Sequence, residues 1–168
     1  MIVKNLNKNF LINLSLIFSI FLLDRLSKIY VIYLDKKNFG DEIFSSKFLD
    51  IQLVWNEGIA FGLFSFDERY LYNVLTLFII IIIFIIFFMF IKSKGLKKYS
   101  LLMILGGALG NVFDRIFYKG VPDFVDFHIG SFHWFIFNFA DVFITLGVFF
   151  MILFEFIGNN YVKDYEKF

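Results

Sequence analysis

Aspartates stand out in this chain because three of them lie inside long apolar stretches of sequence. Asp24, Asp114 and Asp141 occupy such stretches, and Asp123 and Asp126 lie in a short segment between two of them. Two carboxylates that share a desolvated site divide their titration, so that one is protonated while the other stays ionised. Such a pair can activate water. The sequence therefore indicates a hydrolytic pair made of Asp141 and one of the other four aspartates, between which spacing alone does not choose.

Other kinds of catalytic centre lack the residues that they need. The chain has no Cys, which excludes disulfides, thiolate metal sites and cysteine nucleophiles. His128 and His133 do not stand in the His-Glu-x-x-His frame of a membrane metalloprotease, and we interpret them as solvated loop residues. Ser27 and Lys28 are neighbours that point about 100° apart on a helix, so they do not form a Ser/Lys dyad. We expect the hydrolysis to require neither a metal nor an organic cofactor.

Charged and amide side chains share helical faces with two of the aspartates. Asp24 and Lys28 are spaced i,i+4, and Asn111 and Arg115 share a stripe beside Asp114. A charged side chain in a bilayer costs about 3 kcal/mol or more, which makes each a functional candidate. The alternative is structural: Asp24 pairs with Lys28, Asp114 pairs with Arg115 or with a neighbouring helix, and the amides tie helices together.

A third polar face contains Asn138, Asp141 and Thr145. No basic residue lies within one helical turn of Asp141, and an unpaired buried carboxylate tends to be protonated or functional. Gly106 and Gly110 form a small-xxx-small pattern, which we interpret as a close helix contact. Asp141 is thus the aspartate that a structural role explains least well.

Composition places these residues in a membrane protein. The 168 residues are 60% hydrophobic and include 28 Phe, while the net charge of only +1 offers no broad basic surface for nucleic acid. Four apolar stretches are each long enough to cross a bilayer, at residues 10–34, 70–91, 99–117 and 134–156. We predict a single membrane domain over residues 1–168, with an all-α bundle of four transmembrane helices.

The charges between the spans predict the orientation of the bundle. The loop between the second and third spans contains Lys92, Lys94, Lys97 and Lys98 and no acid, which is typical of a cytoplasmic loop, so both termini should be cytoplasmic. The loop at residues 35–68 is rich in acids and should lie outside. Within it, apolar residues stand at every second position from Leu49 to Trp55, mostly separated by polar ones, which predicts a small extracytoplasmic β element between the first two helices.

The predicted orientation brings three aspartates to a similar depth. At a rise of 1.5 Å per residue, Asp24 lies roughly 21 Å and Asp114 roughly 22 Å from the cytoplasmic start of their helices. Asp141 lies roughly 10 Å below the outer surface if its span begins at Trp134. The polar faces therefore meet in the outer half of the bilayer.

Four short segments follow one another along the chain, at Asn56–Phe61, Gly110–Arg115, Val121–Phe124 and Phe137–Asp141. Taken together they resemble the lipoprotein signal peptidases, also called signal peptidase II, which are aspartic endopeptidases of the bacterial inner membrane. Asp24 and Lys28 match the polar first span of that family. The resemblance covers the chain from Asp24 to Glu155, and the segments are specific when they are taken together.

The resemblance implies roles for particular residues. It makes Asp123 and Asp141 the catalytic pair and selects Asp123 over Asp126. It also implies that the remaining site residues bind substrate or support the aspartates, namely Asn56, Asn111, Arg115, Asn138, Asp24, Lys28 and Asp114. Pro122 departs from the aliphatic residue of many members, and we interpret it as ordering the approach to Asp123, because Pro fixes its own φ.

The same resemblance implies a substrate and a place of action. Members of the family cut a prolipoprotein just before a cysteine that carries diacylglycerol. The expected partners are therefore diacylglyceryl-modified prolipoproteins and membrane lipids, and we expect a monomer with its site at the extracytoplasmic face of the cell membrane. Two rival functions remain open on the residues alone, a small ion or proton transporter and a non-catalytic assembly factor, because intramembrane Asp and Asn also line ion pathways.

The orientation can be tested with reporter fusions. A reporter fused after Lys97 should be cytoplasmic, and one inserted near Lys47 should be external, because the basic loop stays inside during insertion. Alkaline phosphatase and green fluorescent protein activities in whole cells would report the two sides. The reverse pattern would overturn both the orientation and the depths inferred from it.

Overall fold

The computed structural model describes residues 2–58 and 69–165, which form helices and strands in a simple order. The elements are α1 (Ile2–Lys37), β1 (Phe44–Ser45), β2 (Leu49–Asn56), α2 (Arg69–Lys92), α3 (Leu96–Tyr118), β3 (Val121–Ile129), β4 (Phe132–Phe137) and α4 (Phe139–Tyr165). Residues 59–61 of the first family-like segment lie outside the described residues, as do Asp67 and Glu68 of the acidic loop.

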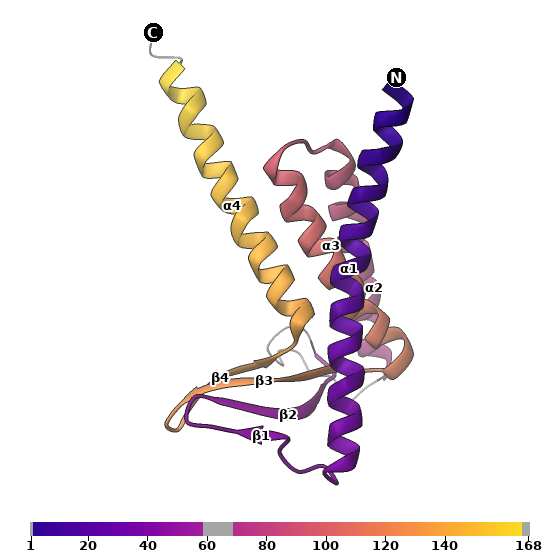
Figure 1. Ribbon diagram of the computed structural model, residues 1–168, viewed down its shortest axis with the longest axis vertical. Helices are drawn as coiled ribbons and strands as arrows, with labels where there is room; N and C mark the ends of the chain where they lie inside the picture. The colour runs from indigo at the N-terminus through magenta and orange to yellow at the C-terminus, as the bar shows by residue number, and fades with distance from the viewer. Residues whose placement is uncertain (1, 59–68, 166–168) are drawn as a thin grey trace.

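The prediction of four apolar helices is confirmed in the described part of the chain. Each helix contains a stretch long and apolar enough to cross a membrane, at Lys8–Lys37, Tyr70–Lys92, Leu96–Tyr118 and Phe139–Ile157. The ends of each stretch lie within three residues of the ends of the corresponding predicted span, except that the fourth stretch begins five residues later than predicted. The start of α1 and the end of α4 lie at the same end of the bundle (Figure 1).

Helix α3 is the centre of the bundle, since it contacts α1, α2 and α4. In its most apolar window 67% of the residues are buried inside the protein, against at most 17% in the other three helices. The outer helices therefore turn large apolar side chains outward, as a lipid solvent requires. The Gly, Asn and Asp residues of α3 face protein and not lipid, which explains how so polar a helix can cross a membrane.

A four-stranded antiparallel sheet lies at the end of the bundle opposite the start of α1, in the order β1-β2-β3-β4 (Figure 1). Strand β2 pairs with β3 through Trp55–Pro122 and Asn56–Val121, which brings the end of β2 next to the start of β3. Strands β3 and β4 form a hairpin joined at Gly130, whose φ of 61° suits a tight two-residue turn. The predicted strand from Leu49 to Asn56 coincides with β2.

The segment before α4 corrects the sequence prediction. Trp134 to Phe137 belong to β4, and α4 begins at Phe139, so the predicted start of the fourth span at Trp134 is wrong. The aromatic run is apolar enough to extend a hydropathy window, but aromatic residues also favour strands. Asp141 is consequently the third residue of α4, about 3 Å along the helix and not 10 Å deep. The sheet also extends beyond the first loop, because β3 and β4 contribute half of it.

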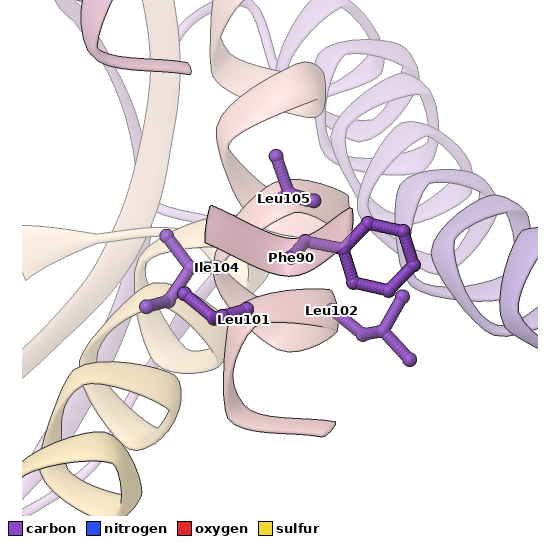
Figure 2. Packing of buried hydrophobic residues seen from close by; sticks show 5 residues of the cluster. All are labelled: Phe90, Leu101, Leu102, Ile104 and Leu105. Atoms are coloured by element: carbon purple, nitrogen blue, oxygen red, sulfur yellow. The ribbon is translucent and has the colours of Figure 1, made fainter. Parts of the chain in front are cut away.

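The apolar core lies at the end of the bundle away from the sheet. Phe90 from the end of α2 packs with Leu101, Leu102, Ile104 and Leu105 from the first turns of α3, and all five are at least 91% buried (Figure 2). This cluster fixes α3 against α2 at one end, which leaves the other end of α3 for polar residues.

Small residues allow α3 and α4 to approach closely. A Cβ added to Gly107 would come within 2.5 Å of the backbone oxygen of Ala140, the second residue of α4. Gly106 and Gly110 likewise face α1, where a Cβ would meet Ile20 and Asp24 respectively. The small-xxx-small pattern is therefore a helix contact, as the sequence predicts.

Replacing Gly107 by Ala should destabilise the protein. The new methyl group would clash with backbone that cannot rotate away, and overpacking of this kind costs about 1–3 kcal/mol, more than the helix propensity gained. Thermal unfolding in detergent should show a lower Tm. Gly120→Ala is the matched control, because its Cβ would only reach an ordinary contact at 3.4 Å from Trp55. Equal Tm values for the two variants would contradict the close contact.

Candidate active site

A buried ammonium group joins α1 and α3 near the sheet. Lys28 Nζ on α1 donates hydrogen bonds to Asp24 Oδ2 at 2.8 Å, to Asn111 Oδ1 at 2.7 Å and to Asp114 Oδ2 at 2.7 Å. The side chains of Lys28, Asp24 and Asp114 are 0% exposed. Since an ammonium has three N–H donors, all of them are used. The predicted pairing of Asp24 with Lys28 is present.

Asp114 is held by α1 and not by its neighbour in sequence. Arg25 Nη1 donates to Asp114 Oδ1, and the Arg25 guanidinium also lies 4.7 Å from the ring centre of Phe113. Of the two partners that the sequence left open for Asp114, the neighbouring helix is therefore the one observed. Arg25 is a member of this cluster that the sequence analysis missed, although its position beside Asp24 was a signal for it.

Asp24 extends the cluster to α4. Its Oδ1 accepts a hydrogen bond of 3.0 Å from the backbone N–H of Ala140, in the first turn of that helix. The first N–H groups of a helix have no partner within the helix, and its positive dipole end favours a carboxylate. Asp24 thus anchors the start of α4 on α1.

A capping box fixes the start of α4 and one of the two aspartates with it. Asn138 Oδ1 accepts from the backbone N–H of Asp141 at 3.1 Å, and Asp141 Oδ2 accepts from the backbone N–H of Asn138 at 3.2 Å. This reciprocal pair at the N-cap and the third helical residue satisfies two donors at once. The Asn138–Asp141 spacing was a sequence signal for the true helix start, which a hydropathy window overlooks.

The second aspartate, Asp123, comes from β3. Its Oδ2 accepts 2.8 Å from Asn56 Nδ2 on β2, and its Oδ1 accepts 2.5 Å from Asn138 Nδ2. Asn138 therefore binds Asp123 with its side-chain N–H and Asp141 through its oxygen and backbone. Only 3% of Asp123 is exposed. Burial, and then the charge of Asp141, raise the pKa of Asp123 to about 6, against the opposing effect of the two amide donors.

Asn111 connects the ion cluster to the aspartate pair. Its Oδ1 accepts from Lys28, and its Nδ2 donates to Asp141 Oδ1 at 2.8 Å. The ammonium thereby fixes which end of the amide faces Asp141, because an ammonium binds only the oxygen. Both oxygens of Asp141 thus have a defined donor.

Arg115 holds the chain that follows β2. Its Nη2 donates to the carbonyl oxygen of Gly58 at 2.6 Å, and its backbone oxygen accepts from the hydroxyl of Tyr72 on α2. Gly58 N in turn donates to Asn56 Oδ1 at 2.9 Å, which orients the amide that binds Asp123. Arg115 therefore reaches the aspartates through Gly58 and Asn56. Tyr72 is a further contributor that the sequence did not single out.

An apolar groove opens beside the pair. A cavity of about 320 Å³ lies between the sheet and α4, and its wall includes Asp141. The other lining residues are Phe127, Trp134, Phe135, Phe137, Val142, Thr145 and Leu146. Pockets that bind small apolar groups are typically of this size and lining, with a few polar groups at the reacting end.

Asp126 lies apart from this centre. It is three positions after Asp123 on β3, and the extra residue of the irregular β2–β3 pairing lies on β2 between Ile51 and Val54, so the two side chains on β3 point to opposite faces of the sheet. Asp126 pairs with His133, at 2.8 Å between Oδ2 and Nδ1. The interpretation of His128 as a solvated loop residue is wrong, because its side chain is 11% exposed and lies 3.4 Å from Asp50.

Comparison with known proteins assigns the family. The family model described as "Signal peptidase (SPase) II" matches residues 16–157. The chain belongs to the signal peptidase II family. It is 48% identical over 160 residues to the lipoprotein signal peptidase of Pelagibacter ubique (strain HTCC1062), covering 95% of this chain and 96% of that protein. Identity to the lipoprotein signal peptidase of Anaplasma marginale (strain Florida) is 39%, over 77% and 75% of the two chains.

The fold of this signal peptidase II chain is similar to that of solved proteins. One bacterial membrane enzyme, solved at 2.3 Å by the in meso method, superimposes with a TM-score of 0.72 and 27% identity over 88% of each chain. A second, solved at 1.9 Å, gives a TM-score of 0.65 and 28% identity over 84% of this chain and 90% of the other. The family is therefore supported by both sequence and fold.

All nine residues that the sequence analysis selected for this signal peptidase II chain lie in one connected network. Its members are Asp24, Lys28, Asn56, Asn111, Asp114, Arg115, Asp123, Asn138 and Asp141. Arg115 joins it through a hydrogen bond of 3.4 Å from Nη1 to the backbone oxygen of Asn111. The network links three helices to the sheet.

Removing the amide of Asn56 should raise the pKa of Asp123. Asn56 Nδ2 stabilises the ionised carboxylate, so Asn56→Ala should move the pKa from about 6 to about 7 or above, since a hydrogen bond to a charged group contributes about 1.5–3 kcal/mol. Carboxyl ¹³C shifts followed against pH, with Asp123→Asn to assign the resonance, would measure this. Asn13→Ala, at the other end of α1, should leave the pKa unchanged. A pKa that stays or falls in Asn56→Ala would contradict the arrangement.

Proposed function

We propose that the chain is an aspartic endopeptidase that removes the signal peptide from bacterial prolipoproteins. The two relatives named above are lipoprotein signal peptidases, and the chain covers nearly all or most of each. The proposed reaction is hydrolysis of the peptide bond before a cysteine that carries diacylglycerol.

One observation carries this proposal. Asp123 and Asp141 come from different elements and are joined by Asn138, and Asp141 lines an apolar groove. A carboxylate pair needs water, whereas a diacylglyceryl chain needs apolar surface. The groove between β4 and α4 offers that surface beside Asp141, which suits a substrate that is half peptide and half lipid.

The proposed mechanism uses one proton shared by the pair. The ionised aspartate takes a proton from a water molecule, and the oxygen of that water attacks the scissile carbonyl carbon. The protonated partner aspartate hydrogen-bonds the developing oxyanion and then protonates it. The first aspartate then gives its proton to the amide nitrogen, the C–N bond breaks, and the new carboxyl group returns a proton to the pair. No residue attacks the peptide, so no acyl-enzyme forms.

The surrounding residues would hold the pair in position. Asn56, Asn111 and Asn138 present N–H donors to the aspartates, which keeps both carboxylates fixed before substrate arrives. In the described part of the chain Arg115 Nε is buried without a hydrogen-bond partner. Because this atom is closed off from solvent, we expect Arg115 to support Asp123 through Gly58 and Asn56 and not to contact the substrate directly.

The proposed place of action is the extracytoplasmic face of the cell membrane, with the enzyme acting as a monomer. Asp123 lies on the sheet and Asp141 in the first turn of α4, so the pair sits where the helices end. A lipid-anchored cysteine would present its peptide bond at that level. The lysine-rich connection between α2 and α3 is at the other end, which supports cytoplasmic termini.

Replacing either aspartate by Asn should abolish cleavage. Purified Asp123→Asn and Asp141→Asn should cut a diacylglyceryl-cysteine precursor at least about 100-fold more slowly than the natural protein, because each variant loses a proton-transferring group. Mass spectrometry of the products would give the rate and the bond cut. Asp41→Asn, an exposed acid outside the network, is the matched control and should cut normally.

Two outcomes would contradict the assignment. Full activity in either of the first two variants would remove that aspartate from the catalytic pair. Ion flux in proteoliposomes that depends on Asp141, without any peptide cleavage, would favour the transporter instead. Thermal unfolding of each variant would separate loss of chemistry from loss of fold.

A further inference from the structure

A second group of acids and imidazoles lies on the sheet, away from the aspartate pair. Asp126 and His128 are two positions apart on β3, so they share a face. Asp50 on β2 is directly opposite Asp126, and His133 on β4 is directly opposite His128. Three neighbouring strands thus bring two carboxylates and two imidazoles together. These are the only two histidines of the chain.

The contacts within this group leave ligand atoms unused. One ligand atom each from Asp126, His128 and His133 lies within 4.8 Å of the other two. The imidazole rings stack with centres 5.0 Å apart, and Asp50 Oδ2 is 3.4 Å from His128 Nδ1. Among the described residues, Asp126 Oδ1 and His128 Nδ1 are two of the few buried side-chain atoms without a hydrogen-bond partner. Buried polar atoms without a partner are costly, so these two require an explanation.

A metal ion would supply the missing partner. Two imidazoles and a carboxylate suit divalent first-row transition metals, and Zn²⁺ takes such ligands at about 2.0–2.2 Å. Ligand atoms around such an ion are about 3–4 Å apart, so the spacing of 4.8 Å must close slightly. His133 is 54% exposed, so its ring can rotate and a hydrated ion can reach it.

We propose that Asp126, His128 and His133 bind a divalent transition-metal cation of the zinc type, with Asp50 completing the ligand set. The ion would cross-link β2, β3 and β4 at the outer part of the sheet, on the far side of β3 from Asp123. It takes no part in peptide hydrolysis, so the site is independent of the proposed function. Its role is to hold together the strands that border the apolar groove.

Zinc binding by the full-length protein tests this proposal directly. Protein in detergent, purified through a tag without histidine, should bind about one equivalent of Zn²⁺ in equilibrium dialysis. X-ray absorption at the zinc edge should show imidazole scattering, which can come only from His128 and His133. His128→Gln and His133→Gln should each weaken binding at least about 10-fold. Asp41→Asn, an exposed acid elsewhere, should bind as the natural protein does.

The opposite results would overturn the site. If the natural protein binds no more Zn²⁺ than the double variant His128→Gln/His133→Gln, or if bound zinc shows no imidazole scattering, the cluster is only a pair of Asp–His contacts. The X-ray absorption measurement uses the natural protein alone, so its result remains valid even if His128→Gln unfolds. Because neither measurement involves peptide cleavage, failure here leaves the hydrolytic assignment untouched.

Discussion

The structure depends on the neutralisation of buried charge around Lys28. An ammonium on α1 is removed from water and lies in the bundle, where an unpaired charge would be very unfavourable. Two carboxylates, Asp24 and Asp114, and one further cation, Arg25, surround it, so the charges of the four groups cancel. Loss of one member would leave a buried charge unpaired, which typically costs about 3–5 kcal/mol. The four charged residues of α1 and α3 therefore depend on one another, because replacing any one of them leaves another unpaired.

This neutral cluster also determines the geometry of the aspartate pair. Asp24 binds the first turn of α4, and Lys28 orients Asn111, which in turn binds Asp141. Each link is a hydrogen bond between groups on different helices, so the position of Asp141 follows from the packing of α1, α3 and α4. Gly107 permits that packing by leaving no side chain between α3 and Ala140. Rigid elements thus place the carboxylate without requiring a loop to fold over it.

Sequence reasoning predicted the four apolar helices better than it predicted the segment between α3 and α4, and the residues that it selected lie in one hydrogen-bonded network. Hydropathy is decisive for α2, which carries no charge from Tyr70 to Ile91, because length and apolarity are enough to specify a transmembrane helix. It fails at Trp134, where the same aromatic residues satisfy either a helix in lipid or a strand beside it. The pairing of Asp123 with Asn56 across β2 and β3 could not be derived, because strand register depends on contacts between distant segments.

Asp123 lies on a strand and Asp141 at the start of a helix, an arrangement that suits a site in contact with both water and lipid. A carboxylate deep in the bilayer has no water to activate, whereas one on an exposed strand loses the desolvation that raises its pKa. Asp123 avoids the second problem because Asn56 and Asn138 bury it against the bundle, yet it remains outside the spanning helices. Asp141 avoids the first because the capping box starts α4 at Phe139, only two residues before it. On the proposed function, the position of that helix end, and not the depth of the span, would place the hydrolysis at the membrane surface.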